Sequence, residues 1–323
     1  MCSSGSQSLH LQPPAVARVG GIRIDLACYH SLVGSNVTPY FSSFSLAQQG
    51  YVPLLKKKEQ KKNNACSMCN PSSSLPPTHL SPNLQHVFSI RQDHSHHRRP
   101  ASGIGLATAK LLARQGARLS LADIQQDRLS AVADELRSLN SGERAVEVLT
   151  SVVDVRDRSQ VDDWMARTIS HFGGGALDGA ANLADTAGVL NCVRAQLKVI
   201  RQGDGGRRGG GSIVNASSLA GLTGFANHVA YSASKHAVIA ITRCAAQEEG
   251  ARGVRVNAVA PGAIATPMLE RMDQAFGQRL PDRCALARRG DADEAAQLIC
   301  FLLADESSFV TGAVYRVDGG WNG

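Results

Sequence analysis

From residue 101 onward, the sequence alternates between segments that have the pattern of a helix and segments that have the pattern of a strand. Helices are expected at about 103 to 115, 125 to 139, 157 to 171, 189 to 201, 230 to 249 and 291 to 304. Strands are expected at about 117 to 123, 145 to 153, 176 to 182, 212 to 217, 253 to 259 and 312 to 317. Because two parallel strands need a crossover between them, this alternation predicts an α/β fold with a doubly wound parallel sheet, in a single domain over residues 101–323.

Residues 1–100 differ from the rest of the chain in composition and charge. They are rich in Ser, Pro, Gln, Asn and His, and few of their segments could bury an apolar face, so we expect a largely disordered N-terminal extension. The formal net charge of +7 lies entirely here, with 10 Lys and Arg against 3 Asp and Glu, while the remainder has 24 of each sign. The lysine-rich block 56–62 could contact nucleic acid or a membrane, but a solvated tail is the default interpretation, and neither partner is predicted.

The cysteines and the apolar runs bear on metal binding and location. Cys66 and Cys69 could form half of a zinc site with nearby histidines, but no second Cys-x-x-Cys or His-x-x-x-His completes it, and no metal is predicted. The 8 cysteines have no framework spacing, which favours reduced thiols in an intracellular protein. No apolar run approaches the ~20 residues of a membrane span, and the N-terminus lacks the pattern of a secretory signal. The predicted location is cytoplasmic.

Tyr231 and Lys235 lie four residues apart in the helix expected at 230–249, so both project from one face. A tyrosine titrates near ~10, and proton exchange near neutral pH requires a pKa lower by about 2 to 3 units, or roughly 3 to 4 kcal/mol. An ammonium about 4 Å away contributes on the order of 4 kcal/mol at a protein surface, so one lysine suffices. Such pairs are common on exposed helices. The hydroxyl of Ser218, after the strand at 212–217, and the turn at Pro261 and Gly262 favour a catalytic site.

A nucleotide site is predicted at the start of the first expected helix. Gly103, Ile104 and Gly105 open this helix, where free backbone amides and the helix dipole favour a pyrophosphate. Glycines at a helix start are often only turn residues, but Asp123 ends the next strand, where its carboxylate can accept hydrogen bonds from ribose hydroxyls. The same carboxylate would repel a 2′-phosphate, so NAD is favoured over NADP. Asp123 could also be an N-cap with Gln126 at N3, and the two roles are compatible.

Four motifs in combination resemble the short-chain dehydrogenase/reductase family, in its 3-oxoacyl-reductase-like branch. They are residues 211–218, Tyr231-x-x-x-Lys235, residues 255–262 and residues 310–320. The resemblance covers about residues 101–323. It implies a Rossmann-like fold and an oxidoreductase that transfers a hydride between NAD(H) and a secondary alcohol or ketone, with Ser218, Tyr231 and Lys235 as catalytic residues.

The resemblance also implies further contacts and partners. The cofactor would touch Tyr231 and Lys235 and, in addition, Asp154, Asn182, Pro261, Gly262, Ile264 and Thr266. The partners would be a small-molecule alcohol or ketone and further copies of the chain, in a homodimer or homotetramer that forms through the helices near 189–201 and 230–250.

The chain departs from the family pattern before the first glycine of the nucleotide turn. Arg98, Arg99 and Pro100 stand where the family has the end of an apolar central strand and the beginning of its glycine-rich turn. The charged, histidine-rich residues 91–97 cannot form a buried parallel strand. Residues 84–90 are the nearest substitute, but about a dozen residues separate them from Gly103. The first strand is therefore predicted to be lost or badly replaced.

A second departure follows Asn182. Family members have some two dozen residues between the turn at this position and a helix that supplies a catalytic Asn, whereas this chain passes directly to Asp185. Aligned forward, Asp185 replaces a glycine of the turn; aligned backward from Gly188, it replaces the catalytic Asn. Two functions are therefore open: a working oxidoreductase, and a catalytically impaired relative that acts as a binding or interaction module.

Overall fold

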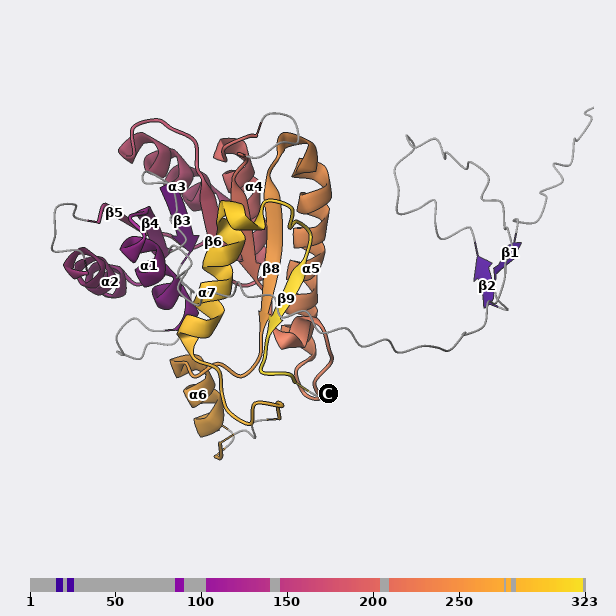
Figure 1. The fold of residues 1–323 in the computed structure, drawn as a ribbon. Coiled ribbons are helices and arrows are strands. Elements are labelled where there is room, and N and C mark those ends of the chain that lie inside the picture. Colours follow the sequence, from indigo (N-terminus) through magenta and orange to yellow (C-terminus); the bar gives the residue numbers. More distant parts are fainter. Residues whose placement is uncertain are drawn as a thin grey trace, which may run out of the picture. The chain divides into compact units, whose positions relative to one another are not determined.

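The structure is a computed structural model of the chain, and it describes residues 16–19, 22–25, 85–89, 103–139, 146–203, 209–275, 277–279 and 283–321 (Figure 1). The chain divides into two units, Met1–Pro71 and Ser72–Gly323. In the first unit, β1 (Val16–Val19) and β2 (Ile22–Asp25) form an antiparallel pair. The predicted extension, residues 1–100, thus contains β1 and β2 and also the strand Gln85–Ser89 of the second unit. The lysine-rich block and the Cys66–Cys69 pair lie outside the described residues.

The second unit contains a seven-stranded sheet in which every pairing is parallel, with the order β5-β4-β3-β6-β7-β8-β9. Its strands are β3 (Gln85–Ser89), β4 (Arg118–Asp123), β5 (Val148–Val152), β6 (Gly179–Asn182), β7 (Ser212–Ala216), β8 (Arg255–Pro261) and β9 (Val314–Val317). The chain runs outward from β3 to β5 and then returns to β6 beside β3. Ligands of such sheets bind outside the carboxyl ends of the strands, where the direction of winding reverses.

Of the two outcomes predicted for the first strand, its loss is wrong, and the substitute named from the sequence, residues 84–90, contains the strand that the structure has at this place, β3. Gln85–Ser89 pairs with β4 on one side and with β6 on the other, so that His86 is the register partner of both Leu119 and Gly179. From the sequence alone the replacement is a poor one, because about a dozen residues separate it from Gly103. Parallel pairing requires only a short run of backbone N–H and C=O groups in register, and the connection that follows can be long. The central strand of the sheet therefore lies before the expected boundary at residue 101.

Helices cover both faces of the sheet, as predicted (Figure 1). On one face lie α1 (Ile104–Arg114), α2 (Gln126–Ser138) and α7 (Ala292–Leu303), and on the other α3 (Arg158–His171), α4 (Thr186–Val199) and α5 (Val229–Glu249). Their apolar stripes form one buried cluster with each face of the sheet, because inner strands such as β7 and β8 are buried on both sides. The short helix α6 (Pro267–Ala275), which was not predicted, has no buried residue.

Two further features of the described residues bear on the sequence-based expectations. Within the described part of the chain, each helix is too short or too polar to cross a bilayer. Four cysteines in these ranges are free thiols: Cys192, Cys244, Cys284 and Cys300. Burial raises the pKa of the Cys192 thiol and of the Cys300 thiol to about 12, so neither is a reactive thiolate near neutral pH.

Candidate active site

Ser218 and Tyr231 lie on two segments that pack directly against each other. Ser218 follows β7 and caps the short helix η2 (Leu219–Gly221), where its Oγ accepts a hydrogen bond from the Ala220 amide at 3.2 Å. Tyr231 lies in the first turn of α5. Gly221 is where η2 meets α5: a Cβ at this position would lie 2.7 Å from the carbonyl oxygen of Lys235. Because Gly221 has no side chain, η2, which Ser218 caps, can approach α5, the helix that carries Tyr231, this closely.

Lys235 is a buried cation held by main-chain oxygens. Its side chain projects from α5 toward the carboxyl edge of the sheet, and the residue is 8% exposed. Its Nζ donates to the carbonyl oxygen of Ala184 at 3.1 Å and to that of Ala216 at 3.0 Å, just beyond β6 and at the end of β7. The same Nζ lies 6.0 Å from the centre of the Tyr231 ring, within the range of a cation–π contact. The structure thus brings Lys235 and Tyr231 together on one face of α5.

The start of α1 has the features of an anion site. Gly103 is its N-cap, with a φ of 101° that disfavours a side chain, and no side chain caps the first turn. The amides that follow, beginning with Ile104 and Gly105, are available to a pyrophosphate. A Cβ at Gly103 would lie 3.6 Å from the Thr266 methyl, so the nucleotide turn adjoins the loop after β8.

Asp123 is fully buried at the end of β4, and one of its oxygens accepts no hydrogen bond from the described residues. Oδ1 accepts from the Gln125 amide at 3.0 Å, and Arg128 Nη1 is 4.0 Å from Oδ2. Oδ2 is buried without a hydrogen bond among the described residues. Burial raises the pKa of Asp123 from 3.8 to about 6, against the opposing effects of the Gln125 amide and of Arg128. Oδ2 of Asp123, a buried acceptor at the end of the strand next to β3, fits a ribose hydroxyl, which would supply the missing hydrogen-bond donor.

Two predicted cofactor contacts have side chains that are already engaged. Asp154 binds the guanidinium of Arg156 through both carboxylate oxygens, at distances of 2.9 Å and 3.1 Å from Nε. Asn182 is fully buried and uses both its amide nitrogen and its amide oxygen in hydrogen bonds to Gln196. The structure therefore gives these side chains protein partners, and contacts with a cofactor at these positions stay a prediction.

The loop after β8 lies at the same edge of the sheet. Pro261 ends β8 and pairs with Val317, and a Cβ at Gly262 would lie 2.8 Å from Cβ of Asp318. Ile264 is buried, and Thr266 donates to the Ile264 carbonyl at 3.3 Å. Pro261 and Gly262, two of the predicted cofactor contacts, are thus positioned by close contact with the end of β9 and the residue after it.

The short connection after Asn182 is closed by a helix cap. Only Leu183, Ala184 and Asp185 separate β6 from α4, and Asp185 is the N-cap, with its Oδ1 accepting from the Gly188 amide at 2.8 Å. Gly188 has no room for a side chain, because its Cβ would lie 3.0 Å from that of Ala184. Asp185 thus serves the helix start, while the preceding carbonyl, of Ala184, receives Lys235.

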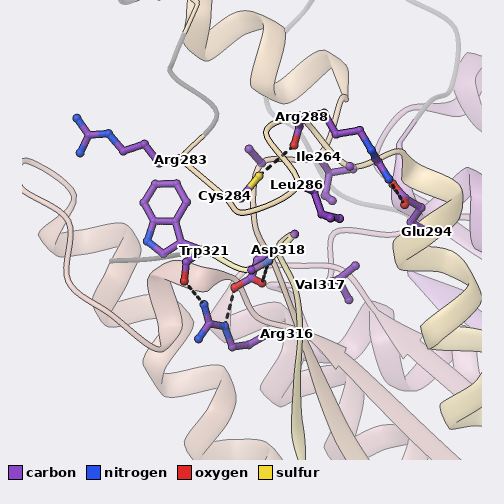
Figure 2. Close-up of a pocket in the computed structure, with 14 residues that line it drawn as sticks. Ile264, Arg283, Cys284, Leu286, Arg288, Glu294, Arg316, Val317, Asp318 and Trp321 are labelled. Atoms are coloured by element: carbon purple, nitrogen blue, oxygen red, sulfur yellow. Dashed lines mark hydrogen bonds and ion pairs between the residues drawn. The ribbon is translucent and has the colours of Figure 1, made fainter.

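A cavity of about 270 Å³ lies between the loop after β8, residues 283–290 and the end of β9 (Figure 2). One wall is a short antiparallel contact, in which the Ala285 and Leu286 amides donate to Gly320 and Gly319 at 3.0 Å each. Two ion pairs, Arg288–Glu294 and Arg316–Asp318, also line the cavity. The apolar lining comes from Ile264, Leu286, Val317 and Trp321.

Trp321 connects this cavity to the loop between Ser218 and Tyr231. Its ring centre lies 5.8 Å from that of Phe225 in an edge-to-face contact, and Phe225 in turn lies 6.4 Å from His228. Neither Trp321 nor Phe225 was predicted as a site residue. A signal was present in the sequence, because a Trp follows the terminal glycine pair and a Phe lies midway between two predicted catalytic residues.

Comparisons with known proteins show the family and the fold of the chain. A family model described as short chain dehydrogenase matches residues 100–185, and one described as Enoyl-(Acyl carrier protein) reductase matches residues 184–322. The short-chain dehydrogenase/reductase aba4 of Botryotinia fuckeliana is 45% identical over 253 residues, covering 68% of this chain and 93% of that protein. Levodione reductase of Leifsonia aquatica is 35% identical over 250 residues, covering 68% of this chain and 90% of that protein. A crystal structure of levodione reductase has a TM-score of 0.62 at 31% identity and covers 73% of this chain and 96% of its own.

Proposed function

The chain belongs to the short-chain dehydrogenase/reductase family, and from this premise we propose that it transfers a hydride between NAD(H) and a secondary alcohol or ketone. The observation that carries the proposal is the buried Lys235 ammonium, held by two strand-end carbonyls and 6.0 Å from the Tyr231 ring. Burying a cation costs free energy. The presence of the buried ammonium therefore indicates a role other than stability. Its place beside a tyrosine, at the edge where ligands of such sheets bind, supports a role in proton transfer.

Each catalytic side chain has a chemical role in this proposal. Ser218 Oγ accepts from the Ala220 amide, and its own hydrogen can be donated to the substrate oxygen. In alcohol oxidation, Tyr231 takes the hydroxyl proton, and the Lys235 cation favours the ionised phenol electrostatically. NAD, when bound, would accept the hydride from the carbinol carbon. In ketone reduction the proton returns from Tyr231 to the substrate oxygen.

The chain's own residues support NAD over NADP. The first-turn amides of α1 would hold the pyrophosphate, and Asp123 Oδ2 would accept from a ribose hydroxyl. A 2′-phosphate in the same place would meet a carboxylate whose burial strengthens the repulsion. Calorimetric titration of the purified chain should show NAD binding at least about tenfold tighter than NADP, and the reverse order would contradict the assignment.

We place the carbon body of the substrate in the cavity beside Trp321. Its lining combines two ion pairs with the apolar side chains of Ile264, Leu286, Val317 and Trp321. Its volume of about 270 Å³ exceeds the roughly 150 Å³ that holds a benzene molecule in an engineered apolar site. Ile264 on one side and the Trp321–Phe225 contact on the other support a position next to the reacting centre. This favours an alcohol or ketone with an apolar body of about one ring.

One observation favours the second candidate, an impaired relative that acts as a binding module. Asp185 stands at the position of the family's catalytic Asn when aligned from Gly188, and its side chain is engaged as a helix cap. A screen of the purified chain with NAD and a panel of secondary alcohols distinguishes the two functions. Formation of NADH supports the oxidoreductase, whereas NAD binding without turnover on any alcohol favours the binding module.

Assembly and location also remain proposals. A homodimer or homotetramer through α4 and α5 is consistent with the small exposed residues on α5, among them Ala233 and Ala240. Sedimentation of the purified chain would test this, and a monomer at micromolar concentration would contradict it. The cytoplasmic location is likewise carried forward as a prediction, and fractionation of cells that express the chain would test it.

A further inference from the structure

Four buried polar side chains form a connected group behind the candidate catalytic residues. They are Asn182, Gln196, Asn215 and Thr242, here called the amide cluster, and each is 0% exposed. We propose that the amide cluster positions Lys235, a role that rests on the function proposed above.

The amide cluster joins two strands and two helices. Asn182 on β6 and Gln196 on α4 exchange two hydrogen bonds, of 2.9 Å and 2.8 Å. Asn182 Nδ2 also donates across to Asn215 Oδ1 on β7 at 3.0 Å. Asn215 Nδ2 donates to Thr242 Oγ1 on α5 at 3.0 Å, and Thr242 donates to the Val238 carbonyl at 2.8 Å.

The same elements provide Lys235 and the carbonyls that hold it. Asn215 directly precedes Ala216, and Asn182 lies two residues before Ala184, whose carbonyl oxygens accept from Nζ. Asn182 and Asn215 are register partners on β6 and β7. Thr242 lies two helical turns after Lys235 on the same face of α5. The side-chain bonds that join these elements therefore also fix the distance between the ammonium and its acceptors.

Main-chain acceptors make Lys235 sensitive to small movements of the strands. A carbonyl cannot rotate to follow the ammonium, and N–H···O hydrogen bonds are lost beyond about 3.2 Å to 3.5 Å. The Asn182–Asn215 bond spans the two strands whose ends carry these carbonyls. Apolar side chains of the same shape would fill this space without the need to satisfy buried amides. A satisfied polar cluster instead specifies one relative position of β6, β7 and α5.

The chain contains a matched control for this role. Thr168 is also 0% exposed, and its Oγ1 donates to the carbonyl four residues earlier, that of Trp164, at 2.8 Å. It also shares a 2.8 Å hydrogen bond with Ser120. Thr242 makes the same kind of pair, one bond to its own helix and one to a side chain on a strand. The bonds of Thr168 join α3 to β4 rather than the elements around Lys235.

The test compares Thr242→Val with Thr168→Val in the full-length, cofactor-free protein, with Gln196→Leu as a second cluster variant. Acetic anhydride modifies lysines at a rate set by their exposure, and mass spectrometry measures the rate for Lys235 relative to Lys110 on α1. We expect about tenfold faster modification of Lys235 in both cluster variants, which corresponds to about 1.4 kcal/mol. In Thr168→Val we expect less than about a twofold change. Equal modification of Lys235 in Thr242→Val and Thr168→Val would overturn the proposal.

The pH dependence of kcat/KM gives a second readout that a merely structural role would not move. In the cluster variants, the pH profile of kcat/KM should shift, because the Lys235 ammonium no longer keeps its native position beside Tyr231. Thr168→Val should lose about as much stability as Thr242→Val, but its pH profile of kcat/KM should not shift. A shift as large as that of Thr242→Val would contradict the proposal. Because modification of Lys235 needs no turnover, an inactive chain with the expected labelling pattern would contradict the proposed function while supporting the positioning role.

Discussion

At the scale of single residues, Asp123 and Lys235 are buried charged groups that the chain stabilises in different ways. Lys235 donates to two carbonyl oxygens, whereas one oxygen of Asp123 accepts no hydrogen bond from the described residues. The Asp123 carboxylate is consequently destabilised, and burial raises its pKa to about 6. A group held in an unfavourable state until a ligand arrives is typical of a binding site.

Asp123→Asn should stabilise the cofactor-free protein at neutral pH. The pKa of Asp123 is raised on folding from 3.8 to about 6. The protonated side chain is therefore favoured in the folded state, and its contribution to the free energy of unfolding is fully present below pH 4 and is lost as the pH rises through 6. The variant should be more stable by about 3 kcal/mol at pH 7 and nearly equal to wild type near pH 4. Thermal unfolding at both pH values measures the difference. A variant less stable than wild type at pH 7 would show that Asp123 is satisfied in the free protein.

The sequence predicts the relative position of residues that share one helix, but not which residues from distant segments contact each other in the fold. The four-residue offset of Tyr231 and Lys235 predicts that they share a helix face, and the structure agrees. The amide cluster could not be found in this way, because Asn182 and Thr242 lie 60 residues apart and meet only through Asn215. Spacing therefore predicts chemistry within one element, while the packing that supports it depends on the fold.

At the scale of elements, the site depends on the contact between η2 and α5. Ser218 and Tyr231 come from different segments, and the close approach at Gly221 sets the distance between them. The start of α4 is a second such junction, where the Asp185 cap allows a three-residue connection from β6. Sequence reasoning expected α4 to begin near residue 189, later than Thr186, because it did not recognise Asp185 as a cap.

Gly221→Ala should impair catalysis more than stability. The added Cβ would lie 2.7 Å from the Lys235 carbonyl oxygen, so η2 must move away from α5 and carry Ser218 with it. We expect kcat to fall about a hundredfold, since a misplacement of about 1 Å has effects of this size. Gly250→Ala is the control, because its Cβ would meet nothing within 4 Å and its φ is −56°. Comparable activity in the two variants would contradict this role of the contact.

The wall of the cavity gives a prediction about substrate size. Leu286 is 61% exposed at the cavity, so Leu286→Trp should fold normally and reduce the space available to the substrate. KM should rise about tenfold for ring-sized alcohols and change little for the smallest secondary alcohols. Phe309→Trp is the control, because Phe309 is fully exposed and does not line the cavity. Equal effects on large and small substrates would argue against this placement.

At the scale of the whole molecule, the central strand of the sheet, β3, lies within residues 1–100, which composition predicts to be an extension. The doubly wound architecture could be predicted, because each helix and strand after residue 101 has its own periodicity. For the central strand, the sequence indicates residues 84–90 only as the nearest substitute, since a five-residue segment carries little pattern and its place in the sheet depends on pairing with β4 and β6. Long-range pairing is where local sequence is least informative.

Truncation should reveal this dependence. A chain that begins at Ala101 lacks the strand between β4 and β6 and should not fold, because two strands would lose their shared partner. A chain that begins at Ser72, where the second unit starts, should keep the cooperative unfolding of the full chain. Circular dichroism during heating distinguishes the two. Cooperative unfolding of the chain that begins at Ala101 would contradict the assignment of β3.

The most direct test of the account is the formation of NADH by the purified chain with a secondary alcohol, compared with that of Tyr231→Phe. The substitution removes the proton-accepting oxygen and leaves the ring beside Lys235 in place. The account predicts turnover by the wild type and a loss of about a thousandfold in kcat for the variant, with NAD affinity unchanged. Equal turnover by Tyr231→Phe and wild type would contradict it.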